Sequence, residues 1–268
     1  MTVTILLTAL ALLSPTTYAL TPPRPVVNTS LGSLEGVALL GGADAFLGVP
    51  YATPPIDGLR FLRAIPRAAW EGTRDASEYG AACVQNLTNS IPDPENFTMS
   101  EDCLFLNVWR PSVPSVSTTA AVGGGGGGGA GRCGGGLLPV FVYIHGGSFM
   151  IGSGAAHTYR GTNLTEAECI VTVTLNYRLG ALGFLATNLD GDGNGSGAMQ
   201  GINDMIEALA WLKSNIAGEC AGVDCVSVLF ACVLVYCVLC AVCACARVRV
   251  CACECVLCAV CCVLYSMC

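Results

Sequence analysis

Two short apolar runs rich in β-branched residues mark the middle of the chain, at residues 140–144 and 170–176. Their length and composition are typical of strands that are buried on both faces of a parallel sheet. Between residues 205 and 216, apolar residues recur at helical spacing, while Glu207 and Lys213 fall on the opposite side. Strand, glycine loop, strand and amphipathic helix in this order predict an α/β fold with a doubly wound, mostly parallel sheet.

The N-terminal half has a different pattern. Residues 26–110 contain short apolar stretches interrupted by prolines, which predicts short strands and turns wrapped over a core. Residues 117–136 contain the uninterrupted glycine run 123–129, which cannot bury apolar surface. We therefore predict a Gly-rich, disordered insert at 117–136, between two strands. The alternative, a phosphate-binding loop, requires a specific glycine spacing and a helix start directly afterwards, and the sequence has neither.

The first residues indicate secretion. An apolar stretch at residues 5–13 is too short to span a bilayer and is followed by a polar break and small residues, so we predict a cleaved signal peptide at 1–19. The alternative is a retained anchor, since no Lys or Arg marks the start. Five N-x-S/T sequons agree with a secreted, extracellular glycoprotein. They are Asn28, Asn86, Asn96, Asn163 and Asn194.

The charge of the chain excludes one class of partner. The formal net charge is -7, the isoelectric point is about 4.7, and Lys and Arg do not cluster anywhere. Binding to phosphate backbones requires a basic face, so we expect no nucleic-acid partner.

Residues 218–268 form a low-complexity tail rich in Cys and Val. Fourteen of the 18 cysteines lie there, and the segment 238–243 recurs word for word at 256–261. A TG dinucleotide repeat read in frame would give alternating Cys and Val, so we interpret the tail as non-native read-through from a retained intron or a frameshift. A secreted domain does not carry so many regularly alternating thiols without a disulfide framework.

Two other interpretations of the tail remain open. Residues 226–246 carry no charge and are long enough to be scored as a transmembrane helix, with Arg247 and Arg249 as a flank. This would make the chain membrane-anchored, which we regard as a false signal. The second is a metal site at two C-x-x-C pairs, but their separation falls short of the zinc pattern and other cysteines surround both.

The most informative segment is 145–149, His-Gly-Gly-Ser-Phe, which follows the apolar run 140–144. A strand that ends in glycines can offer backbone N–H groups to a developing oxyanion, as ester hydrolases require. The same enzymes then need a G-x-S-x-G turn that exposes the attacking serine. No serine in this chain has glycines two residues before and two residues after it.

The motifs of residues 26–217 together resemble the type-B carboxylesterases, a group that includes cholinesterases and the non-catalytic neuroligins. Segment 101–107 is similar to the E-D-C-L-x-L-N signature, and 176–184 is similar to N-Y-R-L-G-x-x-G-F. The segments that carry the resemblance, in family order, are residues 46–55 with 60–61, 70–72 with 83–85, 101–107, 145–148, 176–184, and 201–204 with 208–211 and 215–216. The resemblance implies the N-terminal part of an α/β-hydrolase, a partial domain at 20–217 truncated before the nucleophile elbow.

The resemblance also implies roles for single residues. Gly147 and Ser148 match the residues whose N–H groups form the oxyanion hole, and Gly146 allows the turn. Cys83 and Cys103 match the family's first disulfide. For the remaining cysteines before the tail, at positions 133 and 169, we find no partner, and we interpret the two histidines, at 145 and 157, as a structural and a loop residue.

The implied activity is hydrolysis of small carboxylic esters by a serine acyl-enzyme route, without cofactor or metal. We identify no nucleophile, acid or base, and we give Asp204 and Glu207 no catalytic role. Aligning 226–230 with the family's nucleophile strand places Val233 where serine should stand. We therefore expect a catalytically incomplete chain that aggregates through an exposed sheet edge. The alternative is a neuroligin-like adhesion protein, in which the fold serves binding without catalysis.

Overall fold

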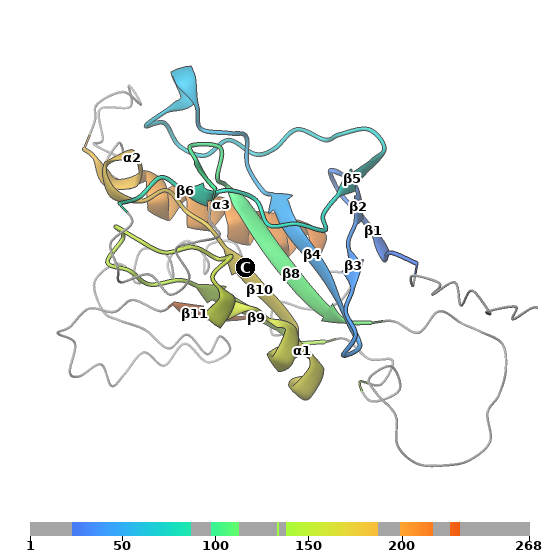
Figure 1. The fold of residues 1–268 in the computed structure, drawn as a ribbon. Helices are drawn as coiled ribbons and strands as arrows, with labels where there is room; N and C mark the ends of the chain where they lie inside the picture. The colour runs from blue at the N-terminus through green and yellow to red at the C-terminus, as the bar shows by residue number, and fades with distance from the viewer. Residues whose placement is uncertain are drawn as a thin grey trace, which may run out of the picture.

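A six-stranded mixed sheet forms the centre of the molecule in the computed structural model, which describes residues 23–86, 98–112, 133, 138–186, 199–216 and the backbone of 226–230. The strand order is β11-β9-β10-β8-β4-β3 (Figure 1). The strands are β3 (Val37–Ala38), β4 (Ala43–Pro50), β8 (Phe105–Pro111), β9 (Val140–Ile144), β10 (Val171–Leu175) and β11 (Val226–Phe230). The predicted strands at 140–144 and 170–176 are thus confirmed as β9 and β10.

The three strands β11, β9 and β10 are parallel and in register, so that Ile144 pairs with both Leu175 and Phe230. The pairs β10–β8, β8–β4 and β4–β3 are antiparallel. The predicted α/β class is confirmed, and the described part of the sheet is mixed rather than mostly parallel. Strand β11 comes from the segment that the sequence assigns to the tail, at the start of the 226–246 run.

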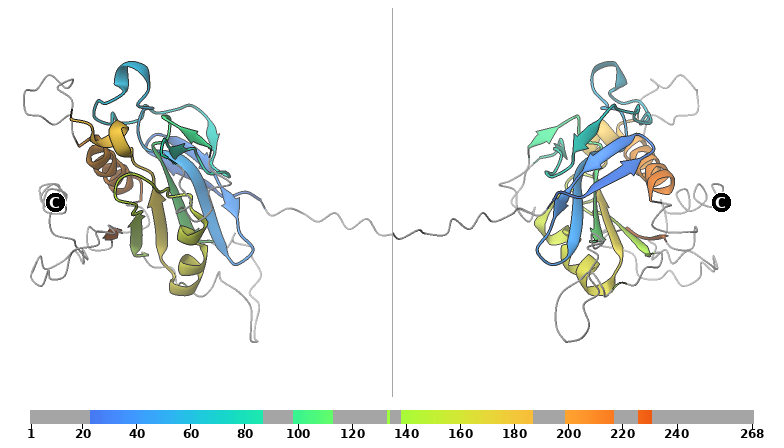
Figure 2. Two further views of the ribbon diagram at one scale, coloured as in Figure 1. Left: turned by 60° about the vertical axis from the view of Figure 1, so that its left-hand side comes forward. Right: turned by 90° about the vertical axis from the view of Figure 1, so that its right-hand side faces the viewer.

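Helices cover both faces of the sheet. Along β10, Val171, Val173 and Leu175 belong to the core cluster that includes α3 (Gln200–Asn215), and α2 (Gly180–Phe184) packs beside α3. The alternate residue Thr172 points the other way, where its hydroxyl accepts a hydrogen bond from Thr165 of α1 (Thr162–Glu168) at 2.9 Å. Helix α3 lies along one face of the sheet (Figure 2). The doubly wound arrangement is therefore confirmed.

Short strands and turns fill the N-terminal half, as the proline pattern predicts. A three-stranded sheet has the order β1-β2-β5, and β6 pairs with β7. These strands are β1 (Val26–Thr29), β2 (Gly32–Glu35), β5 (Thr73–Asp75), β6 (Ala82–Cys83) and β7 (Met99–Ser100), and the 3-10 helices are η1 (Asp57–Leu59) and η3 (His157–Tyr159).

The core lies between the sheet and α3. Val142 and Val173 are fully buried, as are Leu106 of β8 and Ala208 of α3. Each fully buried aliphatic side chain of valine or leucine size stabilises the fold by about 1.5–3 kcal/mol. This packing explains why the apolar spacing of 205–216 predicts a helix, although the helix begins earlier, at Gln200.

Two disulfides fasten the described part of the chain. The bond between Cys83 and Cys103, which the resemblance implies, is confirmed. A second bond joins Cys133 to Cys169, the two cysteines for which the sequence offers no partner. Cys169 ends α1 in a left-handed conformation, with φ of 54°, and so ties the end of this helix to residue 133.

Several predictions lie outside the described residues: the signal peptide at 1–19, the insert at 117–136 apart from Cys133, and the tail apart from 226–230. Within the described ranges, none of the helices has the length and apolar character needed to cross a bilayer.

Candidate functional site

The segment His145 to Ser148 leaves the sheet at the carboxyl end of β9. The chain passes from β9 to its neighbour β10 on one side, and then from β10 through α3 to β11 on the other side of β9. In open α/β sheets, ligands bind outside the carboxyl ends of the strands at the point where the strand order reverses in this way. The topology alone therefore indicates a ligand site at the carboxyl end of β9, where the glycine motif lies.

A tight left-handed turn follows His145. The φ angles are 118° at Gly147, 54° at Ser148 and 59° at Phe149. A Cβ atom on Gly147 would lie 1.9 Å from the carbonyl oxygen of Ile151, so only glycine fits there. Ser148 lies in the small left-handed region that residues other than glycine can adopt. Serine therefore fits this turn, and its backbone N–H can serve as the donor that the resemblance implies.

Hydrogen bonds to two carbonyl groups fix the direction of two neighbouring N–H groups. The Gly146 carbonyl accepts from Nδ1 of His145 at 2.9 Å, and the Gly147 carbonyl accepts from the N–H groups of Met150 and Ile151 at 3.0 and 3.1 Å. In a trans peptide the N–H points away from the C=O, so these bonds orient the N–H groups of Gly147 and Ser148. Within the described part of the chain, neither N–H donates a hydrogen bond.

His145 is completely buried beneath this turn. Its ring stacks on Tyr177 with a centroid distance of 4.5 Å, and the Tyr177 hydroxyl donates to the His145 carbonyl at 3.0 Å. Burial lowers the pKa of His145 to about 4, although the contact with the Gly146 carbonyl opposes this shift. The imidazole is therefore neutral at physiological pH, and Nε2 has no hydrogen-bond partner among the described residues. This placement supports a structural role.

Two buried amide side chains hold the segment that follows the turn. Asn176, just after β10, accepts from the Gly154 N–H at 2.8 Å and from the Ser153 hydroxyl at 3.1 Å. Asn107 on β8 donates to the Gly154 carbonyl at 3.3 Å and to the Thr174 hydroxyl at 3.0 Å. Both asparagines lie inside the matched motifs, but the sequence gives no sign of these contacts. Their effect is to fix the backbone against the sheet.

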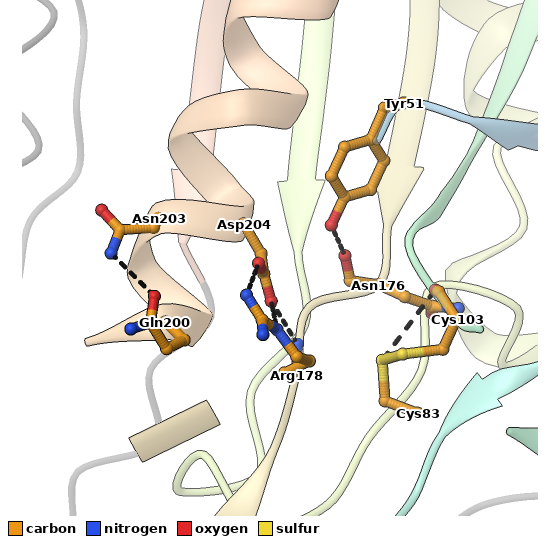
Figure 3. A network of polar contacts seen from close by, with 8 residues as sticks. All are labelled: Tyr51, Cys83, Cys103, Asn176, Arg178, Gln200, Asn203 and Asp204. Carbon is orange, nitrogen blue, oxygen red and sulfur yellow. Dashed lines mark hydrogen bonds and ion pairs between the residues drawn. A yellow bond between two sulfur atoms is a disulfide. The ribbon is translucent and has the colours of Figure 1, made fainter. Parts of the chain in front are cut away.

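A buried ion pair fixes the segment after β10. Asp204 of α3 accepts hydrogen bonds from Arg178 through Nε at 2.8 Å, Nη2 at 2.7 Å and the backbone N–H at 3.0 Å (Figure 3). Burial raises the pKa of Asp204, while its hydrogen bonds and charge interaction with Arg178 oppose that rise. Beside this pair, the Tyr51 hydroxyl donates to the Asn176 carbonyl at 2.7 Å. The Asp204 carboxylate therefore has a structural role, which agrees with the sequence analysis, where it is given no catalytic role.

The sequons and the second histidine that the sequence singles out are on the surface where the structure describes them. Asn28, Asn86 and Asn163 are exposed, while Asn96 and Asn194 lie outside the described residues. His157 is an exposed residue of η3. In the ranges that the structure describes, no three His, Cys, Asp or Glu side chains come together as metal ligands. The C-x-x-C pairs of the tail fall outside those ranges.

Comparison with known proteins identifies relatives of the chain. Neuroligin-3 of Mus musculus is 37% identical over 77% of this chain and 29% of its own length. Acetylcholinesterase of Danio rerio is 38% identical over 74% of this chain and 30% of its own length. The matched part of the chain therefore spans about three tenths of the length of these relatives.

Solved structures with the same fold are esterases. A PNB esterase matches with a TM-score of 0.64 and 32% identity, over 78% of this chain and 39% of the esterase. A carboxylesterase of Geobacillus stearothermophilus matches with a TM-score of 0.61 and 33% identity, over 77% and 37% of the two chains. The fold is that of an α/β-hydrolase. The model of the carboxylesterase family matches residues 23–220, and the chain belongs to this family.

Proposed function

We propose that the N–H groups of Gly147 and Ser148, with Gly146 allowing the turn, bind the oxyanion that forms when a carboxylic ester is attacked at its carbonyl carbon. The observation that supports this proposal is the pair of neighbouring N–H groups, which are oriented by bonds to their carbonyls and donate to no described residue. Each such donor in an acyl-transfer site lowers the barrier by about 2.7–4 kcal/mol. Their position at the switch point of the sheet agrees with a ligand site.

The proposed chemistry is hydrolysis of small carboxylic esters through a serine acyl-enzyme, without cofactor or metal. The ester carbonyl would point between the two N–H groups, while a serine attacks the carbon and a base takes its proton. We further propose that this chain supplies the oxyanion-binding part of the site and not the nucleophile. The reason is that no serine in it stands in a G-x-S-x-G sequence.

An NMR titration of the isotope-labelled 268-residue chain, in a buffer in which light scattering shows it to be monomeric, tests the oxyanion site. The probe is a small phosphonate monoester, an anion that mimics the charge and shape of an attacked ester. We expect saturable shifts of the Gly147 and Ser148 amide signals. The variant Ser148→Gly keeps the N–H and accepts the φ of 54°, so it should bind the probe equally well. Unchanged amide signals at saturating probe would contradict the proposal.

An esterase assay tests the second part. With simple acyl esters of nitrophenol we expect no turnover above the rate of the buffer. Rapid cleavage that a serine-directed organophosphate abolishes would show that the chain contains an attacking serine after all.

A second function, binding without catalysis, is favoured by one observation: the identity to neuroligin-3 is 37%, almost equal to the 38% to acetylcholinesterase. The genomic sequence after the codon for Ala217 distinguishes the two. An in-frame exon that encodes G-x-S-x-G supports the hydrolase, whereas one with the serine replaced supports a protein-binding role. The same sequence would show whether residues 218–268 come from a retained intron, as we propose.

We propose an extracellular location for the chain. Two disulfides in the described part and three exposed sequons support it, because disulfides persist in oxidising compartments. Expression in a secretory cell line should yield glycosylated protein in the medium, and a glycosidase should reduce its apparent mass. Retention of unglycosylated chain in the cytosol would contradict this location.

A further inference from the structure

The side chain of Gln85 pairs with a backbone segment as a neighbouring strand would. Its Nε2 donates to the Gly152 carbonyl at 2.8 Å, and its Oε1 accepts from the Gly152 N–H at 2.7 Å. The same Nε2 also donates to the Cys83 carbonyl at 3.0 Å. Cys83 is anchored by its disulfide to Cys103 and by the pairing of β6 with β7. One amide side chain therefore connects a rigid, cross-linked segment to Gly152.

Gly152 in turn touches the groups that orient the two N–H donors. Its φ is 126°, and a Cβ there would lie 2.2 Å from Nδ1 of His145, so its backbone packs directly against the imidazole. That same Nδ1 holds the Gly146 carbonyl. The preceding residue, Ile151, donates its N–H to the Gly147 carbonyl at 3.1 Å. Nδ1 of His145 and the N–H of Ile151, which bond to the two carbonyl groups of the turn, are thus both adjacent to Gly152.

We propose that Gln85 is a positioning residue that sets the direction of the Gly147 and Ser148 N–H groups through Gly152. The inference rests on the proposed oxyanion-binding function. Without the amide, Gly152 keeps its left-handed φ but loses both bonds that fix its plane. The bond from Ile151 to Gly147 and the contact with His145 then vary together. The two N–H groups then take several directions. A smaller fraction of molecules has both groups in the geometry that binds an anion, so the affinity for the anion falls.

The test compares Gln85→Met with a matched control. Methionine preserves the length of the side chain and removes three hydrogen bonds. Asn215→Ala also removes three, two from Ser30 and one to the Trp211 carbonyl, at a partly buried position of the C-terminal turn of α3. In Gln85→Met we expect shifted and faster-exchanging amide signals for Gly147 and Ser148. We also expect about tenfold weaker binding of the phosphonate monoester.

The variant Gln85→Glu adds a second measurement, the pH dependence of the Gly147 and Ser148 amide signals. A purely structural role of Gln85 would not make these signals depend on pH. A carboxylate cannot donate to the Gly152 carbonyl, whereas the protonated acid can both donate and accept. The two amide signals of this variant should therefore return toward their wild-type positions as the pH falls from about 7.5 to about 4.5, where glutamate, with an ordinary pKa of about 4.3, takes up its proton. This variant also serves if Gln85→Met does not fold.

The outcomes separate the two proposals. Amide signals of Gly147 and Ser148 that change no more in the Gln85 variants than in Asn215→Ala would overturn the positioning role. If the wild-type chain does not bind the probe but these signals still change with Gln85, the oxyanion function fails and the positioning role remains. Probe affinity that is equal in Gln85→Met and the control, with altered amide signals, would also overturn the positioning role.

Discussion

Acidification should destabilise this chain through His145, as the pH falls from about 6.5 to about 4. In the folded chain burial holds the pKa of His145 at about 4, whereas its ordinary value is 6.5. The unfolded chain therefore takes up a proton that the folded chain excludes. The stabilisation is fully present above pH 6.5 and is lost as the pH falls from there toward 4.

The size of the effect follows from the shift. The two pKa values differ by about 2.5 pH units, and each unit corresponds to about 1.4 kcal/mol, so the loss reaches about 3 kcal/mol near pH 4. This loss is a large fraction of the free energy of unfolding of a typical domain, which is about 5–15 kcal/mol. The ring cannot escape the cost by turning outward, because it is stacked on Tyr177 and covered by the turn.

Urea denaturation across this pH range measures the effect, with His145→Asn as the reference. Asparagine can retain a donor near the position of Nδ1 and does not titrate. The free-energy difference between wild type and variant should shrink by about 3 kcal/mol between pH 7 and pH 4. As a second measurement, His157→Gln leaves a single imidazole, whose NMR signal should not move until the pH approaches 4. A constant free-energy difference, or a midpoint near 6.5, would refute the reasoning.

Two further predictions concern single substitutions. Gly147→Ala should cost at least about 2 kcal/mol of unfolding free energy, since its Cβ would overlap the Ile151 carbonyl, whereas Gly58→Ala meets no atom within 4 Å and should stay within about 0.5 kcal/mol. Asp204→Ala should cost about 3–5 kcal/mol because it leaves the Arg178 charge buried and unpaired. Asp75→Ala removes an exposed partner of Arg24, whose charge stays solvated, and should therefore cost far less than Asp204→Ala. Urea denaturation of the four variants checks both, and equal costs within either pair would contradict them.

The strands and the main helix could be predicted because they follow from burial. The sequence placed β9 correctly and β10 to within one residue at each end, since both strands are apolar on consecutive positions. The apolar spacing alone placed the start of α3 five residues late. The reason lies in Gln200 and Asp204, which are polar but buried, so that the first turns of the helix do not show an apolar face.

The contacts that hold the candidate site could not be predicted in the same way. Asn107, Asn176 and Gln85 each bond to a glycine backbone that is distant in sequence, and such pairings leave no periodic signal. The pairing of Cys133 with Cys169 was missed for a related reason: two cysteines in a sequence show that a bond is available and not which fold brings them together. The glycine turn itself could be predicted, because backbone positions with positive φ favour glycine, and glycine is visible in the sequence.

Strands β9, β10 and β11 end at the same level, which sets the distance between their exits from the sheet. Ile144, Leu175 and Phe230 pair across one line, so whatever sequence is joined after Phe230 starts one strand spacing from the exit of β9. Adjacent strands are about 4.8 Å apart. A substitution at the exit of β11 would therefore add or remove a reactive side chain beside the glycine turn without breaking the pairing of the three strands.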